Sequence, residues 1–201
     1  MVSTRIYIEG GGDSKELHAR CREAFRRLLE KCGLEGRMPR LVACGSRASA
    51  FDDFSTAHAN ARTDDYVALL TDSEMPVEDI EQTWSHLKQH DGWDKPAGAN
   101  DAQVLLMATC METWVASDRQ ALRDHYPGCL QENALPSLTN MESRTRDAVQ
   151  NALVQATRTC RNKYAKGKKS FDVVGRLDPV ELRRHLPSFV RCERVLKDQL
   201  H

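Results

Sequence analysis

The feature that most constrains the fold is a regular alternation of strand and helix patterns through the first 127 residues. The run YVALLT at 66–71 is continuously apolar, as in a strand that is covered on both faces. Leu17, Cys21 and Phe25 recur with the period of a helix. Strands are expected over 4–9, 40–44, 66–71 and 103–109, and helices over 14–32, 48–61, 77–89 and 112–125. Such alternation predicts an α/β fold with right-handed crossovers and a parallel sheet of about four strands, with helices on both faces.

The pattern changes after Pro127. No further strand pattern follows, and helices are expected near 142–161, 179–185 and 188–200. We therefore predict an α/β domain over residues 1–127 and a helical extension over 128–201 that packs on it. Asp13 with Glu16 indicates a capping box for the first helix, and Gly33 indicates its end.

Composition and cysteine spacing exclude some classes of protein. The 29 basic and 29 acidic residues balance, so the net charge is no argument for or against nucleic-acid binding. The seven cysteines contain no CxxC pair, which argues against structural zinc, and we expect no disulfides and a reducing compartment. No apolar run reaches the length of about 20 residues that a membrane span needs. Because the beginning of the chain also lacks the pattern of a secretory signal, we expect a cytoplasmic protein without membrane contact.

Acidic residues follow three of the four predicted strands. Glu9 follows the first, Asp72 and Glu74 the third, and Glu112 the fourth. The carboxyl ends of parallel strands lie at one edge of the sheet, where α/β proteins bind ligands. Clustered carboxylates repel one another unless a cation lies among them, and hard oxygen ligands favour Mg²⁺ or Mn²⁺. The alternative is that each acid only caps a helix or forms a turn.

Phosphate-binding candidates lie at the same edge. Gly11 and Gly12 belong to a glycine loop that would let a phosphate approach the backbone, although the lysine of a P-loop is missing. Arg47 could hold a phosphate bidentately. The alternative is that Ser46 caps the next helix and Arg47 is solvated. The basic stretch RNKYAKGKK at 161–169 suits a nucleic-acid backbone, with Tyr164 for stacking, but composition alone favours a solvated turn.

The acids resemble the Toprim fold, the metal-dependent catalytic domain of topoisomerases, primases and OLD-type nucleases. That family has a glutamate after its first strand and a DxD motif after its third. Glu9 in IEGGGD matches the first, and Asp72 with Glu74 in LLTDSE matches the second. Glutamate replaces the last aspartate of the motif, so the side chain of Glu74 is longer by one methylene, and direct metal ligation is expected from Asp72 before Glu74.

Nearly the whole chain is similar to the bacterial family called domain of unknown function 4276. The matching segments are YIEGGGDSKEL, CGSRASAFDDF, LLTDSEMPV, DGW, LLMATCMETWVASDRQAL and NKYAKGKKSF. The resemblance implies a Toprim-like nuclease fold and a neighbouring ABC- or SMC-like ATPase, as in mobile-element and phage-defence modules. It also implies a phosphate-facing role for Lys166, with Lys163 and Lys169 as further candidates.

Three functions follow as hypotheses. The first is a Mg²⁺-dependent nuclease in which Asp72 and Glu74 hold one or two metal ions. Glu9 is a general acid or base and also a candidate metal ligand, and Glu112 is a further ligand or orients one. The second is a non-catalytic interaction module or regulator of the ATPase. The third is a small-nucleotide phosphohydrolase. A nuclease needs basic groups near the acids, whereas a binding module should expose an apolar patch.

Overall fold

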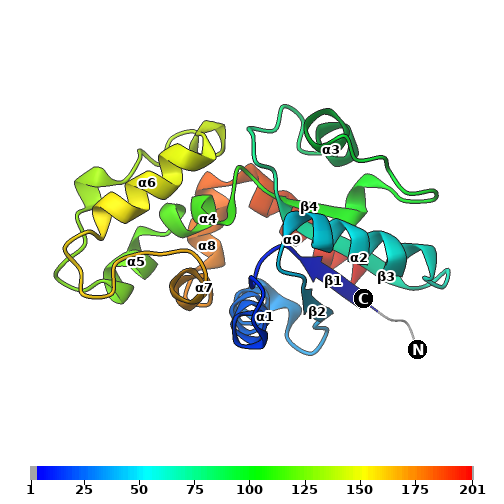
Figure 1. The fold of residues 1–201 in the computed structure, drawn as a ribbon, viewed down its shortest axis with the longest axis horizontal. Coiled ribbons are helices and arrows are strands. Elements are labelled where there is room, and N and C mark those ends of the chain that lie inside the picture. Colours follow the sequence, from blue (N-terminus) through cyan, green and yellow to red (C-terminus); the bar gives the residue numbers. More distant parts are fainter. Residues whose placement is uncertain (1–3, 201) are drawn as a thin grey trace.

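The computed structural model describes residues 4–200, apart from the side chain of Lys168. Within them the chain forms a four-stranded sheet in the order β2-β1-β3-β4, with every neighbouring pair parallel (Figure 1). The strands are β1 (Thr4–Ile8), β2 (Arg40–Ala43), β3 (Tyr66–Asp72) and β4 (Val104–Met107). The predicted α/β class and four-stranded parallel sheet are confirmed.

Helices connect the strands and form the rest of the chain. In the first part these are α1 (Lys15–Leu29), the π-helical turn η1 (Glu30–Leu34), α2 (Arg47–Ala59), α3 (Thr83–Asp91), the 3₁₀ turn η2 (Asp101–Gln103), α4 (Met111–Ser117) and α5 (Arg119–His125). The remainder contains η3 (Glu132–Ala134), η4 (Met141–Ser143), α6 (Arg146–Ala156), α7 (Lys168–Val174), α8 (Pro179–His185) and α9 (Pro187–Gln199). The predicted C-terminal helical part is therefore confirmed.

Both faces of the sheet are covered, because side chains along each strand alternate between two apolar clusters. Ile6 and Ile8 face a cluster that includes Phe25 of α1 and residues of α9. Tyr7 faces the other cluster, with Phe54 of α2 and residues of α3. The first cluster continues into α6, α7 and α8, so one apolar core contains residues from both sides of position 127.

Two predicted helices have different bounds. The helix expected from residue 77 begins only at Thr83, where the carboxylate of Asp101 accepts from the hydroxyl of Thr83 and the backbone N–H of Trp84. The helix expected over 112–125 is broken at Asp118, whose backbone is extended. Its buried carboxylate accepts from the N–H groups of Ala121 and Asp178. In both cases a long-range contact decides where the helix begins.

Helix ends differ in two further places. Ser14, not Asp13, caps α1 by accepting from the N–H of Leu17, so the predicted capping box is wrong. The predicted long helix over 142–161 is only Arg146–Ala156, capped by Thr145. Gly33 lies at the predicted stop of the first helix, with φ 86°.

A disulfide joins Cys129 and Cys160, with their Cα atoms 5.3 Å apart. This overturns the prediction that the chain has no disulfides. The two cysteines are 31 residues apart, and packing of the loop before η3 against the end of α6 brings them together. The cysteine argument for a reducing compartment therefore fails. In the described part of the chain, no helix has both the length and the apolar character to cross a membrane.

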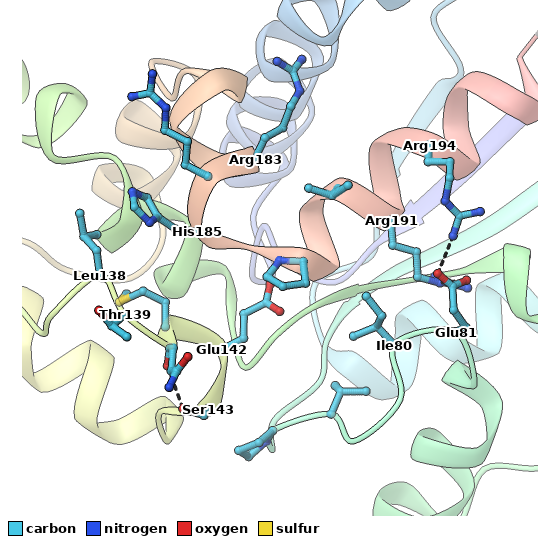
Figure 2. Close-up of a pocket in the computed structure, with 17 residues that line it drawn as sticks. Ile80, Glu81, Leu138, Thr139, Glu142, Ser143, Arg183, His185, Arg191 and Arg194 are labelled. Carbon is cyan, nitrogen blue, oxygen red and sulfur yellow. Dashed lines mark hydrogen bonds and ion pairs between the residues drawn. The ribbon is translucent and has the colours of Figure 1, made fainter.

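A groove of about 870 Å³ lies between the loop after β3, the segment around η4 and helices α8 and α9 (Figure 2). Glu142 reaches from η4 to the first turn of α9, where its carboxylate accepts from the N–H and hydroxyl of Ser188 at 3.0 and 2.5 Å. Burial raises the pKa of Glu142 to about 7, against an ordinary value of 4.5. Sequence patterns did not indicate this carboxylate, because its burial depends on the packing of η4 against α9.

We expect Glu142→Gln to change how stability depends on pH. The folded-state pKa of Glu142 lies above its unfolded value, so the folded state binds an extra proton, and its stability falls as pH rises from about 4.5 to 7. The glutamine variant should be equally stable near pH 4 and more stable at pH 8, by on the order of 1–3 kcal/mol. Urea unfolding at several pH values measures this. Exposed Glu78→Gln is the control, and a difference that does not vary with pH would contradict the prediction.

Candidate metal centre

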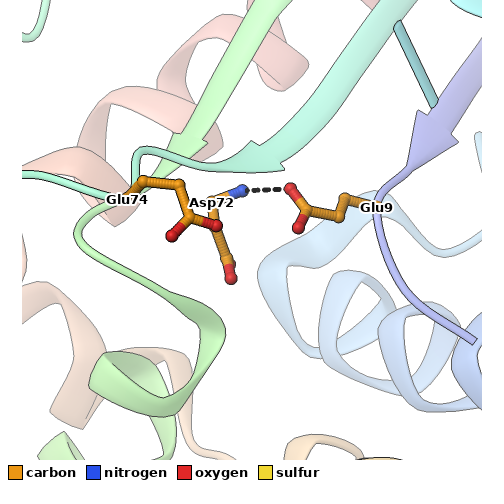
Figure 3. Close-up of side chains that lie close together, drawn as sticks. All are labelled: Glu9, Asp72 and Glu74. Carbon is orange, nitrogen blue, oxygen red and sulfur yellow. Dashed lines mark hydrogen bonds between the residues drawn. The ribbon is translucent and has the colours of Figure 1, made fainter. Parts of the chain in front are cut away.

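Three carboxylates converge at the carboxyl edge of the sheet (Figure 3). β1 and β3 are adjacent and parallel, with Ile8 opposite Leu70, so Glu9 and Asp72 leave the sheet at the same edge. Glu74 follows two residues later. One oxygen from each of the three lies within 4.8 Å of the others. The expected convergence of Glu9 and Asp72 is confirmed, and Glu74 belongs to the same group.

Asp72 is the most buried member of the group, with 6% of its surface exposed. Its Oδ1 accepts from the N–H of Met111, the first residue of α4, at 2.8 Å. Burial raises the pKa of Asp72 well above its ordinary value, and the charges of Glu9 and Glu112 raise it further. A buried carboxyl beside other acids is stabilised by a nearby cation.

A sharp turn and a partner in the helical extension hold Glu74. Its φ is +63°, and its N–H donates to the carbonyl of Thr109 at 2.8 Å. Its carboxylate pairs with Arg146 at the start of α6. The helical extension therefore helps to orient a carboxylate of the sheet edge.

Glu112 lies outside this group, so the expected convergence of its carboxylate with those of Glu9 and Asp72 is wrong, while a metal role for it stays a prediction. The residue is 1% exposed, and its carboxylate accepts from Gln150 Nε2 at 3.2 Å and from the hydroxyl of Tyr164 at 3.1 Å. It lies in the first turn of α4, and its side chain contacts the helical extension. The same contact corrects the expectation that Tyr164 stacks on bases, since its ring is buried.

The glycine loop packs closely against the start of α1. Gly11 has φ +94°, and a Cβ there would lie 2.8 Å from the ring of His18. The His18 ring nitrogen Nε2 donates to the carbonyl of Gly12 at 2.6 Å. Gly45, after β2, would clash with the same carbonyl at 2.7 Å if it carried a Cβ. Close packing therefore requires these glycines, and phosphate binding by Gly11 and Gly12 stays a prediction.

The basic segment 161–169 lies next to the glycine loop. Gly167 and Gly12 both approach the side chain of Leu17, and Phe171 of α7 lies against Gly10. Lys163 and Lys166 are exposed, and Lys169 donates to the carbonyl of Lys163. The backbone at Gly167 thus lies near the start of α1, beside the loop that follows Glu9, and a role of the neighbouring lysines with phosphate stays a prediction.

Ser46 and Arg47 begin α2. Ser46 accepts from the N–H of Ser49 as a helix cap. Arg47 is only 15% exposed and forms ion pairs with Glu9 and Asp91. The alternative reading is therefore right about the cap by Ser46 and wrong about a solvated Arg47. A phosphate contact by either residue stays a prediction.

Ser73 and Cys110, which follow β3 and β4, are not activated as nucleophiles. The hydroxyl of Ser73 donates to the carbonyl of Met75. Burial raises the pKa of Cys110 to about 12, so its thiol stays protonated. The chemistry available at this edge is therefore that of oxygen ligands and of the acids themselves.

Comparisons with known proteins identify the family. No curated protein and no solved structure matches the chain, so the resemblance to the Toprim fold stays a prediction. The family model described as "Domain of unknown function (DUF4276)" matches residues 8–197, which include the three carboxylates, Arg47 and the lysine segment. The chain therefore belongs to the DUF4276 family.

Proposed function

We propose that this protein is a Mg²⁺- or Mn²⁺-dependent nuclease that hydrolyses phosphodiesters. The observation that carries the proposal is the convergence of Glu9, Asp72 and Glu74 within 4.8 Å at the ligand-binding edge of a parallel sheet. A group of three carboxylates, one of them buried, is stable when a cation neutralises it.

The donor set fits a hard divalent cation, because all three side chains offer carboxylate oxygens. Glu9, Asp72 and Glu74 would hold it. When bound, such an ion supplies charge neutralisation and a more acidic water. Glu9 is proposed either as a ligand of this ion or as a general acid or base, and the two roles exclude each other, because three protein donors already bind its Oε2.

The chain's other groups would bind the substrate. Lys163, Lys166 and Lys169 are proposed to supply positive charge for the phosphates of the substrate, and the backbone of Gly11 and Gly12 is proposed as a further phosphate contact. Because the family resembles defence and mobile-element modules, we propose that the protein works in such a bacterial system. Its partner there would be an ABC- or SMC-like ATPase.

An alternative is a non-catalytic module that binds or regulates that ATPase. The contact surface of such a module would include Val190 in the groove, which is 42% exposed, and Met75 after the acids, which is 50% exposed. Purified protein with Mg²⁺ or Mn²⁺ should be tested on plasmid, single-stranded DNA and RNA, alone and with the ATPase plus ATP. Cleavage supports the nuclease, and hydrolysis of free nucleotides alone supports a phosphohydrolase. Tight ATPase binding without any cleavage supports the module.

We expect Lys166→Ala to weaken nucleic-acid binding without removing the metal site. Loss of one phosphate contact should lower affinity by about threefold to tenfold and reduce the salt slope by about 1. Fluorescence anisotropy across a salt series measures both. The control is Lys197→Ala, because Lys197 lies near the end of α9, away from the acids. The end of α9 is held near the start of β2, at the opposite edge of the sheet, where Arg37 donates to the carbonyl of Leu200. Equal loss in both variants would contradict a role for Lys166.

A further inference from the structure

We propose that Arg47, held in place by Asp91 and Trp93, is a permanent cation of the acidic site. Its charge limits the site to one divalent ion. The inference rests on the proposed function, because it concerns how Glu9 meets a metal. It assigns a positioning role to the DGW segment at 91–93.

Arg47 is fixed on the side away from the acids. Its Nε and Nη2 donate to the two oxygens of Asp91 at 2.9 and 2.7 Å, a bidentate pair. The guanidinium carbon lies 4.9 Å from the centre of the Trp93 ring, and that ring stacks on Phe51 at 4.2 Å. Gly92 ends α3 with φ +72°, so that Asp91 and Trp93 both reach the same guanidinium. The two nitrogens that could bind a phosphate bidentately, Nε and Nη2, are therefore already bound to Asp91.

The remaining nitrogen of Arg47 faces the site. Nη1 donates to Glu9 Oε2 at 3.2 Å, to the hydroxyl of Thr71 at 2.6 Å and to the backbone carbonyl of Asp72. Arg47 and Glu9 side chains are each 15% exposed, so water screens the pair weakly. The positive charge next to Glu9 is thus built into the fold.

Glu9 Oε2 is fully used by the protein. Besides Arg47, it accepts from the hydroxyl of Thr71 at 2.5 Å and from the N–H of Asp72 at 3.1 Å. Three donors leave this oxygen no lone pair for a metal, so Glu9 can offer only Oε1. With Oε2 bound in this way, Glu9 would not be able to offer one oxygen to each of two cations. Arg47 therefore occupies the place, and supplies the charge, of a second cation.

The other two carboxylates are tethered in a similar way. Asp72 Oδ1 accepts from the N–H of Met111, and Glu74 Oε1 accepts from Arg146. Within residues 4–200, one oxygen of each of the three acids thus accepts from the protein, and no donor to the other oxygen is found. The second oxygens would together supply three ligands to one hard divalent ion, which fits Mg²⁺ because Mg²⁺ usually keeps several waters.

The test is Mn²⁺ binding, measured by calorimetry and by electron paramagnetic resonance, without any substrate. We expect one Mn²⁺ per chain in the wild type and in Arg47→Lys, which keeps the cation. Arg47→Met removes the charge and frees Glu9 Oε2, so we expect two ions per chain, close enough for their spins to couple. Asp91→Asn leaves Arg47 free to turn onto the acids, and it should weaken Mn²⁺ binding about tenfold.

Asp94→Asn is the matched control, because Asp94 is an exposed neighbour that pairs with Lys88, and it should bind Mn²⁺ as the wild type does. Two ions in the wild type, one ion in folded Arg47→Met, or an unchanged Mn²⁺ affinity of Asp91→Asn would each overturn the inference. If Arg47→Met does not fold, Asp91→Asn decides alone. No binding by the folded wild type would instead overturn the proposed metal-dependent function. A direct phosphate contact by Arg47 would give a different pattern. Arg47→Lys would raise the KM for the substrate and leave its Mn²⁺ affinity unchanged, and Asp91→Asn would bind Mn²⁺ as the wild type does. This pattern would refute the positioning role.

Discussion

Asp72→Asn is expected to lower metal-dependent cleavage by a thousandfold or more, equivalent to about 4 kcal/mol of transition-state stabilisation. The substitution removes the charge of the most buried carboxylate of the group. An asparagine oxygen can still accept from the N–H of Met111, so the local geometry should persist. The measurement is cleavage of the preferred nucleic acid under Mg²⁺ and Mn²⁺. Cleavage that survives would show that the activity comes from another site or a contaminant.

The same variant should be more stable than the wild type when a chelator removes divalent ions. The pKa of Asp72 is raised by burial, by Glu9 and by Glu112, so its ionised form is unfavourable in the folded state. Asparagine mimics the protonated form. We expect a gain on the order of 1 kcal/mol at pH 8 that disappears as pH falls below the unfolded value of about 4. Urea unfolding with EDTA tests this, with Asp94→Asn as control, and a loss of stability at pH 8 would contradict it.

Trp114→Ala is expected to cost about 3–5 kcal/mol of unfolding free energy. Trp114 in α4 is 3% exposed and lies edge-on to Phe25 of α1 and to Phe189 of α9, with ring centres 6.4 and 5.0 Å away. Its indole N–H has no hydrogen-bond partner, so the loss is one of packing alone. The ring joins the sheet's helices to the C-terminal helices, and its removal should weaken both parts together.

Chemical unfolding of this variant also tests whether the chain unfolds in two parts, divided at the predicted boundary at residue 127. Since one apolar core contains residues from both sides, we expect a single transition by circular dichroism and by fluorescence of the remaining tryptophans. Val154→Ala, at a 43% exposed position of α6, should change stability by less than about 0.5 kcal/mol. Two separate transitions would show that residues 1–127 and 128–201 unfold independently.

Local patterns were enough to predict the sheet and two members of the acidic group. A strand is recognised from its own residues, and parallel strands must present their carboxyl ends at one edge. Glu9 and Asp72 therefore converge wherever β1 and β3 are neighbours. Glu74 was expected within reach of them or slightly farther away, and its φ of +63° brings it into the group.

Local patterns failed wherever a side chain's partner lies far along the chain. Glu112 has the same position after a strand as the other acids, yet it contacts Tyr164, 52 residues away. Arg47 meets Asp91, 44 residues away, and Cys129 meets Cys160. Neither periodicity nor propensity contains information on such pairs.

Short-range periodicity and strand direction are encoded locally, and they were enough to predict the α/β class, the order of elements and the edge at which the acids lie. Which carboxylates face one another, and which are bound by protein donors, depends on long-range packing. Side-chain direction at this edge depends on how the helical extension packs: Arg146 holds Glu74, while Tyr164 and Gln150 hold Glu112. These contacts form only when residues from both ends of the chain share one core.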